Sequence, residues 1–149
     1  MEEFNKKVLL GEATWWQMEI PSGKVLFGES KAKMLDYPDA NFKHFSDFTN
    51  LVKEEDREKA MQSMRDCLSE KNKSYETVYN IKKSDGTYVK FYDYGQIIKK
   101  ENENITVIGF VMKVNNDQDI VQEMKEFKEM ILSGNPSIIE LISNIKKTN

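Results

Sequence analysis

The sequence predicts a protein of the α+β class, in which a five-stranded antiparallel sheet carries helices that come between its second and third strands. Three observations lead to this expectation. Runs with a two-residue apolar alternation flank a block with helical spacing, so strands and helices are segregated along the chain. Asp85-Gly86 separates two alternating runs, which is the strongest short-range signal for a β-hairpin. The length of 149 residues suits one domain with an ordinary core.

The chain is expected to begin with a short helix and a hairpin. Residues 1–12 carry apolar side chains at helical spacing, which indicates a helical flank, although a frayed tail is an equally good interpretation. The run 14–20 alternates and places Trp16 and Met18 on one face. A Pro-Ser-Gly turn then leads into a second strand over residues 24–28.

The block that follows is predicted to be helical. Residues 29–35 indicate a short helix that Pro38 stops. Phenylalanines at a spacing of three in residues 41–52 fit one or two helical turns. A longer helix is expected over residues 55–70, because acidic side chains at its start suit the helix dipole. The side chains of this helix expected to face inward are Ala60, Met61, Met64 and Leu68.

Three further strands are predicted over residues 74–82, 88–100 and 105–114. The first two join through the Asp-Gly hairpin, and a polar turn joins the second to the third. The last run is nearly continuous in apolar residues, which is typical of a strand buried on both faces. We therefore expect it to be central in the sheet.

Helices are predicted again at the end of the chain. Asp117 is expected to cap the first of them, and Asn135-Pro136 to begin another. A heptad seam about two heptads long is formed by Ile120, Met124, Phe127 and Ile131. This seam predicts a dimer contact or a signal linker, and the alternative is a helix that folds back onto its own sheet.

Composition and charge exclude several classes of function. The net charge of −3 gives no basic field for nucleic acid or anionic lipid. The single cysteine, Cys67, allows neither an internal disulfide nor a multi-cysteine zinc site, and no other metal site is expected. No signal peptide pattern and no apolar run of about 20 residues is present, so we expect a cytoplasmic protein without membrane insertion.

Five segments, in their order and spacing, resemble the PAS domain with its PAC segment, the sensory-box module of signalling proteins. They are TWWQMEI at 14–20, KMLDYP at 33–38, LVKEEDR at 51–57, IKKSDGT at 81–87 and IGFVM at 108–112. The resemblance implies a PAS-like domain over residues 13–116, with a helical flank over 1–12. Residues 117–149 would then form linker or dimerisation helices.

The resemblance implies a sensory or regulatory domain, and not an enzyme. Such a domain binds a small ligand or protein partner and relays a conformational change through its C-terminal helix. The expected partners are a second copy of the chain and an effector kinase or other signalling domain. The candidate ligand-pocket residues are Trp16, Met18, Phe45, Phe48, Met64, Tyr79, Phe91 and Phe110.

The sequence does not identify a cofactor. A haem-binding relative would use a histidine on a helix over the sheet, whereas His44 lies between Lys43 and a phenylalanine cluster and is expected to be an ordinary helix or loop residue. The cysteine motif of flavin-binding light sensors is absent, and Cys67 lies beside Asp66, which disfavours a thiolate.

Two other hypotheses remain open at this point. The chain could be a ligand-free structural dimerisation module, in which the aromatic residues simply fill a core. It could also be a small isomerase or lyase on an α+β scaffold, for which Asp93 on the long strand is the best candidate acid or base.

Overall fold

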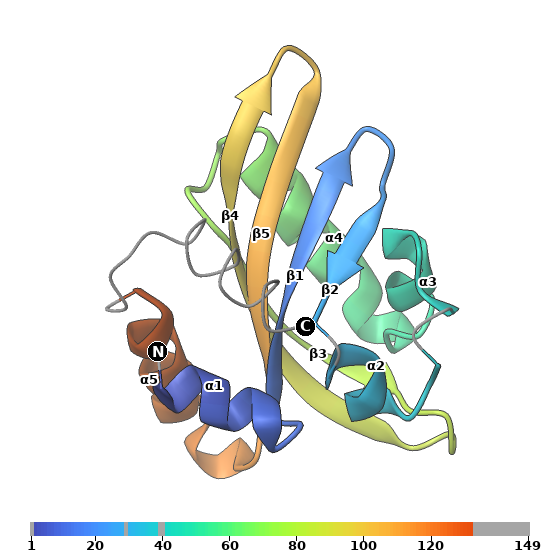
Figure 1. The fold of residues 1–149 in the computed structure, drawn as a ribbon, viewed down its shortest axis with the longest axis vertical. Coiled ribbons are helices and arrows are strands. Elements are labelled where there is room, and N and C mark those ends of the chain that lie inside the picture. The colour runs from blue at the N-terminus through green and yellow to red at the C-terminus, as the bar shows by residue number, and fades with distance from the viewer. Residues whose placement is uncertain (1, 29, 39–40, 133–149) are drawn as a thin grey trace.

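The computed structural model describes residues 2–28, 30–38 and 41–132 of the chain. Its elements follow the predicted order, and the N-terminal flank is helical (Figure 1). They are α1 (Glu2–Leu9), β1 (Ala13–Ile20), β2 (Val25–Phe27), α2 (Ser30–Leu35), α3 (Phe45–Thr49), α4 (Glu54–Leu68), β3 (Tyr75–Lys82), β4 (Tyr88–Glu101), β5 (Asn104–Lys113), the 3₁₀ turn η2 (Asp117–Asp119) and α5 (Ile120–Leu132). None of the helices in the described part of the chain has the length and apolar character needed to cross a membrane.

The five strands form one antiparallel sheet in the order β2-β1-β5-β4-β3. The prediction that the last strand is central is confirmed, because β5 pairs with β1 on one side and β4 on the other. The first and last strands are therefore neighbours, and Trp16 lies opposite Gly109 in their register. This pairing brings the start and the end of the domain together at the middle of the sheet.

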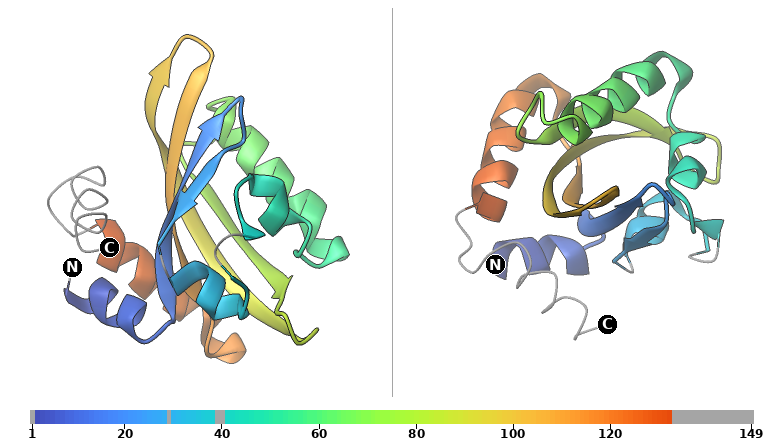
Figure 2. Two further views of the ribbon diagram at one scale, coloured as in Figure 1. Left: turned by 45° about the vertical axis from the view of Figure 1, so that its right-hand side comes forward. Right: turned by 90° about the horizontal axis from the view of Figure 1, so that it is seen from above.

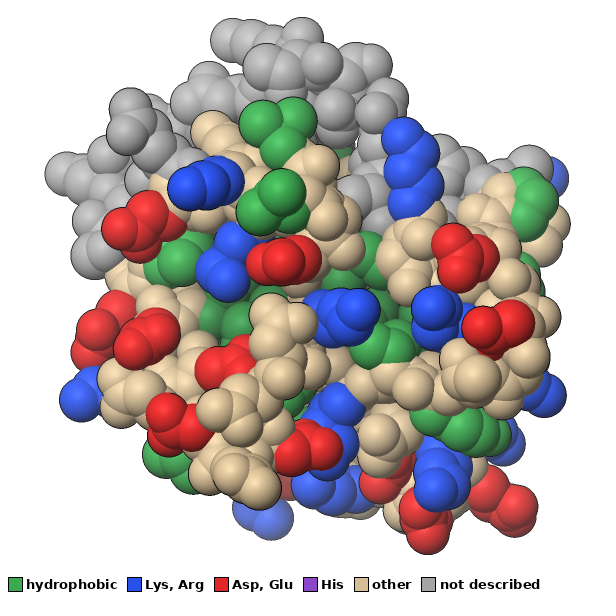
Figure 3. Space-filling model, turned by 90° about the horizontal axis from the view of Figure 1, so that it is seen from below, with side chains coloured by type: hydrophobic (Ala, Val, Ile, Leu, Met, Phe, Trp, Pro, Cys, Tyr) green, Lys and Arg blue, Asp and Glu red, His purple; other side chains and the backbone are tan. Residues whose placement is uncertain are grey.

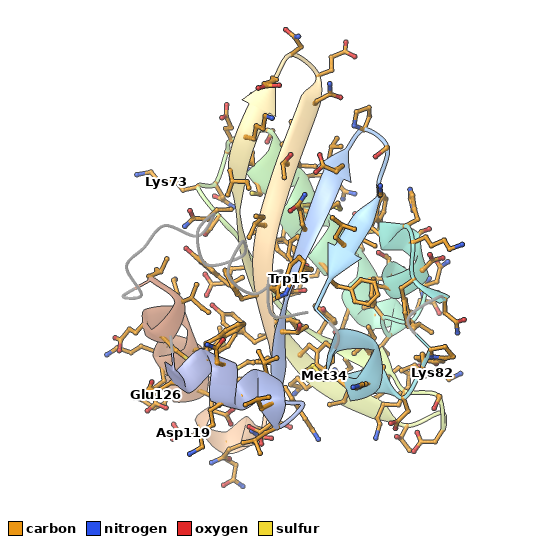
Figure 4. The ribbon with its side chains drawn as sticks, viewed as in Figure 1. Trp15, Met34, Lys73, Lys82, Asp119 and Glu126 are labelled. Atoms are coloured by element: carbon orange, nitrogen blue, oxygen red, sulfur yellow. The ribbon has the colours of Figure 1, made fainter. Side chains whose placement is uncertain are left out.

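Each face of the sheet has its own apolar core. The inner core lies under α2, α3 and α4, and includes Trp16, Met34 and Leu35. The outer core lies under α1 and α5, and includes Phe4 and Trp15. Figure 2 shows the two helical layers on opposite sides of the sheet, and Figure 4 marks Trp15 on β1 and Met34 on α2. The alternation of adjacent tryptophans on β1 thus supplies one large side chain to each core.

The start of the C-terminal helix differs from the prediction. Asn116, not Asp117, is the N-cap residue, since its side chain accepts a hydrogen bond from the backbone N–H of Gln118. Asp117 instead pairs with Lys90 of β4 at 2.9 Å. Asn and Asp are about equally good caps, so two adjacent candidates could not be separated by residue type. The second helix expected from Asn135 lies outside the described residues.

The outward edge of β3 is occupied by groups from α4 and the segment before it. The Ser63 hydroxyl donates to the carbonyl of Glu76 at 3.0 Å. Asp56 accepts the backbone N–H of Asn80 at 2.8 Å. Farther along, the carbonyl of Leu51 accepts the N–H of Lys82 at 2.9 Å. These bonds fix α4 beside the sheet and so set the distance between this helix and the inner face.

The surface carries both signs of charge. On the face seen in Figure 3, acidic and basic side chains alternate around small apolar areas, without a patch of one sign. This distribution agrees with the small net charge of −3.

Candidate ligand cavity

A cavity of about 230 Å³ lies between the inner face of the sheet and helices α3 and α4. Its lining is mostly apolar and aromatic, which is usual for a small-molecule site. The lining residues are Trp16, Met18, Ile20, Val25, Phe45, Phe48, Thr49, Val52, Arg57, Ala60, Met61, Met64, Arg65, Leu68, Tyr75, Tyr79, Ile81 and Asp93. Met61, predicted to face inward, is 37% exposed and lies at the rim.

Trp16, which lines the cavity, lies across two glycines of the sheet. Gly109 on β5 is paired with Trp16 on β1 and with Gly95 on β4, so the two glycines continue the row of Trp16 across the sheet. A Cβ added at Gly109 would lie 2.2 Å from Cζ2 of Trp16. From β3, the ring of Tyr75 meets the indole edge-on at 5.8 Å. The indole can therefore lie flat on the strands only because both positions lack a side chain.

Asp93 is the one carboxylate in the described cavity lining, and it joins three strands. It is 4% exposed, Trp16 Nε1 donates to its Oδ1 at 2.5 Å, and the Tyr79 hydroxyl donates to its Oδ2 at 2.7 Å. Burial raises the pKa of Tyr79 well above its usual range, and the charge of Asp93 raises it further. The same two causes raise the pKa of Tyr75. Both phenols therefore stay protonated, and Tyr79 stays a donor to Asp93, at neutral pH.

The polar groups on the helical side of the cavity are Thr49, Arg57 and Arg65. Arg57 directs one guanidinium nitrogen to the carbonyl oxygen of Val52 at 3.0 Å, and the same nitrogen reaches the carbonyl of Asn50 at 3.4 Å. The more exposed Arg65 pairs with Glu58 at 2.5 Å. The two arginines thus differ in their partners, one with carbonyls and one with a carboxylate.

The predicted pocket residues separate into three groups. Six residues line the cavity: Trp16, Met18, Phe45, Phe48, Met64 and Tyr79. Phe91 belongs to the same inner core and packs beside Tyr79, but does not line the cavity. Phe110 lies on the opposite face of the sheet, in the outer core. Its assignment to the pocket is therefore corrected, because the glycine beside it takes the inward position on β5.

The heptad seam faces the chain's own sheet. Phe127 and Ile131 are 1% and 2% exposed within the outer core, and Met124 packs against it. Phe127 contacts Tyr92 of β4 with ring centroids 6.1 Å apart. Ile120 is partly exposed at the start of α5. The buried seam residues are thus not available to a partner in this arrangement. They fit the alternative in which the helix folds back onto its own sheet.

Gly95, Gly109 and Arg57 were not predicted as site residues. The two glycines carry a signal, since isolated glycines inside strands indicate close approach of another group. Nothing in the sequence context of Arg57 places it at a cavity.

Neither the histidine nor the cysteine fits a cofactor of this fold. His44 is the N-cap of α3, where its Nδ1 accepts the N–H of Ser46 and its ring lies against Gly23. Cys67 is 1% exposed in the inner core and does not line the cavity, and burial raises the pKa of its thiol. A cysteinyl–flavin adduct and haem ligation by histidine therefore have no suitable side chain here. Within the described residues no cluster of three or more His, Cys, Asp or Glu side chains is placed to hold a metal.

Comparisons with known proteins match this architecture. Residues 25–111 match the family described as the PAS fold. No curated protein matches the chain. Among solved structures, a sensory box histidine kinase/response regulator from Burkholderia thailandensis E264 has 17% identity and a TM-score of 0.63, with 89% of this chain and 99% of that chain covered.

Two other structures show a similar likeness. The N-terminal domain of a diguanylate cyclase with PAS/PAC sensor from Marinobacter aquaeolei has 20% identity and a TM-score of 0.61, with 68% of this chain and 94% of that chain covered. A domain of the putative light and redox sensing histidine kinase from Haloarcula marismortui has 16% identity and a TM-score of 0.61, with 74% of this chain and 97% of that chain covered. At these identities the likeness establishes the fold, and the family match spans more than half of the sequence, so the chain belongs to the PAS-fold family.

Proposed function

We propose that this chain is a sensory domain that binds a small ligand in the cavity between α4 and the sheet, and that it relays binding to α5. PAS domains are generally sensory modules without catalysis, so family membership supports a role in signalling. The observation that carries the proposal is an alternation on β4. Asp93 faces the cavity, whereas Tyr92 beside it faces the outer core and α5.

The contacts from Asp93 to α5 form a short continuous path. Tyr92 packs on Phe127, and its hydroxyl donates to Glu76 at 2.7 Å. Glu76 also pairs with Lys128 of α5 at 3.3 Å. A ligand that moves Trp16 or Asp93 displaces β4 on one face, and the same backbone carries Tyr92 against α5 on the other. The relay is a shift between two packings of α5 on the sheet.

The two tryptophans allow a direct test of ligand binding. The chain has 2 Trp residues, whose indole N–H groups give separate signals in a ¹H–¹⁵N spectrum. A set of single-ring aromatic compounds at millimolar concentration is expected to shift the Trp16 signal and leave that of Trp15, on the opposite face, nearly unchanged. Ala60→Leu, which fills the cavity from α4, is expected to abolish the shift while the protein stays folded.

Hydrogen exchange tests the relay in the same samples. A bound compound is expected to change the exchange rates of α5 amides by at least twofold, with no change in Ala60→Leu. If no compound moves the Trp16 signal, ligand binding at this cavity is wrong. If compounds bind and α5 exchange does not change, the relay is wrong.

Self-association is a second proposal, supported by apolar side chains left outside both cores. Leu9, Leu10, Val121 and Leu132 are 88%, 63%, 76% and 49% exposed. Because Phe127 and Ile131 are buried, a homodimer would use this other set of residues, which lie at the end of α1, directly after it, and on α5. Light scattering on the 149-residue chain tests it: Val121→Lys is expected to give a monomer, and a wild-type chain that is monomeric at high micromolar concentration contradicts the proposal.

One observation supports the alternative that Asp93 acts as a catalytic acid or base. Asp93 is buried and faces the cavity, as an acid–base residue would. The two hydrogen bonds from Trp16 and Tyr79 are also what a purely structural carboxylate would have, and the sensory proposal uses them without further assumptions.

A further inference from the structure

Arg57 has an unusual set of partners for a guanidinium that lines an apolar cavity. Its guanidinium donates hydrogen bonds to the neutral carbonyls of Val52 and Asn50. Its Nε is buried and, among the residues that the structure describes, no group accepts a hydrogen bond from it. Asp56, the adjacent carboxylate, is engaged by the backbone and side-chain N–H groups of Asn80 at 2.8 and 3.0 Å.

A guanidinium in this setting favours an anionic partner. Arginine stays charged at all ordinary pH values, and a buried donor without an acceptor costs about 1–3 kcal/mol. A carboxylate meets the requirement, since its two oxygens match the planar N–H pattern of arginine. Arg65 has this kind of partner in Glu58, whereas Arg57 has none in the described part of the chain.

The rest of the cavity limits the size and orientation of such a ligand. A volume of about 230 Å³ is below the roughly 300–1,000 Å³ of drug-sized pockets, so it suits one ring and a short side chain. The floor of the cavity includes the rings of Trp16 and Tyr75, which suits an aromatic ligand ring. Asp93 lies on the sheet side and would repel a second anion, so the acid group is directed toward α4.

We propose that the cavity binds a small monocarboxylic aromatic acid, whose carboxylate pairs with Arg57 and whose ring lies over Trp16. This inference rests on the proposed ligand-binding function and adds the chemical class of the ligand. The class follows from one partly buried cation that has no anionic partner in the described part of the chain, an apolar aromatic floor, and a volume for a single ring.

The test uses three probes with the same ring and different charge: phenylacetate, the neutral phenylacetamide and the cationic 2-phenylethylamine. Affinity for the 149-residue chain is measured from the shift of the Trp16 indole signal and by calorimetry. Phenylacetate is expected to bind at least tenfold more tightly than the amide, and the amine more weakly still. This comparison needs no variant and is therefore independent of folding.

Variants then assign the effect to one residue. Arg57→Met is expected to weaken phenylacetate at least tenfold and the amide less than threefold. Arg65→Met is the matched control on the same helix, because that arginine already pairs with Glu58, and it is expected to change either affinity less than threefold.

The outcomes separate this inference from the proposed function. Equal binding of acid and amide, tighter binding of the amine, or an equal loss in both arginine variants overturns the carboxylate class while ligand binding stands. If none of the three probes moves the Trp16 signal, this inference is wrong. In that case the wider set of single-ring compounds decides whether ligand binding itself also falls.

Discussion

Replacing Gly109 by alanine perturbs the floor of the cavity at one atom. The new Cβ would lie 2.2 Å from Cζ2 and 2.3 Å from Cε2 of Trp16. Both atoms belong to the indole rings, which are rigid, so the ring must leave its place over β5. The hydrogen bond from Trp16 Nε1 to Asp93, now 2.5 Å long, is then lost or lengthened.

The expected cost follows from these two effects. Forcing extra volume into a packed core costs about 1–3 kcal/mol. Leaving the Asp93 carboxylate without one of its donors costs about 1–3 kcal/mol more. Replacing glycine by alanine also stabilises the fold by about 0.4–1 kcal/mol, because it lowers the conformational entropy of the unfolded chain. We therefore expect Gly109→Ala to lower the free energy of unfolding by about 3 kcal/mol, within a range of about 1–6 kcal/mol.

Urea unfolding followed by circular dichroism measures this cost, and a double-mutant cycle assigns it. Trp16→Phe removes the indole atoms that the new methyl group meets, so Gly109→Ala in that background is expected to cost less than about 1 kcal/mol. If alanine at position 109 costs the same with Trp16 and with phenylalanine, the contact with the indole is not the reason for the glycine.

Three further predictions concern the titration and packing of both cores. Burial raises the pKa of Tyr75 and Tyr79, so above about pH 10 the unfolded chain loses protons that the folded chain keeps. The free energy of unfolding is therefore highest below that pH and falls above it by about 1.4 kcal/mol per pH unit for each tyrosine. Urea unfolding at several pH values measures this slope, which is expected to be smaller in Tyr79→Phe. Asp93→Asn replaces one acceptor oxygen by an N–H₂ group that faces donors, and is expected to cost about 1–3 kcal/mol in chemical unfolding; an unchanged midpoint would show that the carboxylate is not needed for this network. Phe127→Ala is expected to cost about 3–5 kcal/mol because Phe127 is 1% exposed, whereas Val121→Ala, 76% exposed, should change stability by less than about 0.5 kcal/mol; similar costs would contradict the docking of α5 on the sheet.

Local sequence patterns were sufficient for most of the fold. The two-residue alternation of β3 and the Asp85-Gly86 turn depend only on neighbouring residues, and both are as predicted. The central place of β5 followed from its apolar run, since only a strand covered on both faces can bury such a sequence. The same run explains the error at Phe110, because a strand that is apolar on both faces does not indicate which residues point to which core.

The site depended on information that local patterns do not contain. The row formed by Trp16, Gly109 and Gly95 exists only once β1, β5 and β4 are paired in register. A seam such as Phe127 and Ile131 is the same for a helix that meets a partner and for one that meets its own sheet, because both bury one helical face. The cavity position of Arg57 required the packing of α4 against β3.

The hydrogen bonds along β3 also have a consequence for how copies of the chain can meet. An exposed edge strand offers backbone groups to which a strand of another molecule can add, which is a common route to aggregation. On β3 the outward groups of Glu76, Asn80 and Lys82 are already occupied by Ser63, Asp56 and Leu51. At the opposite edge, β2 has 3 residues, too few for a long intermolecular ladder. Sheet extension is therefore disfavoured at both ends, so contacts between copies would fall to the helices, whose packing on the sheet is what the proposed ligand would change.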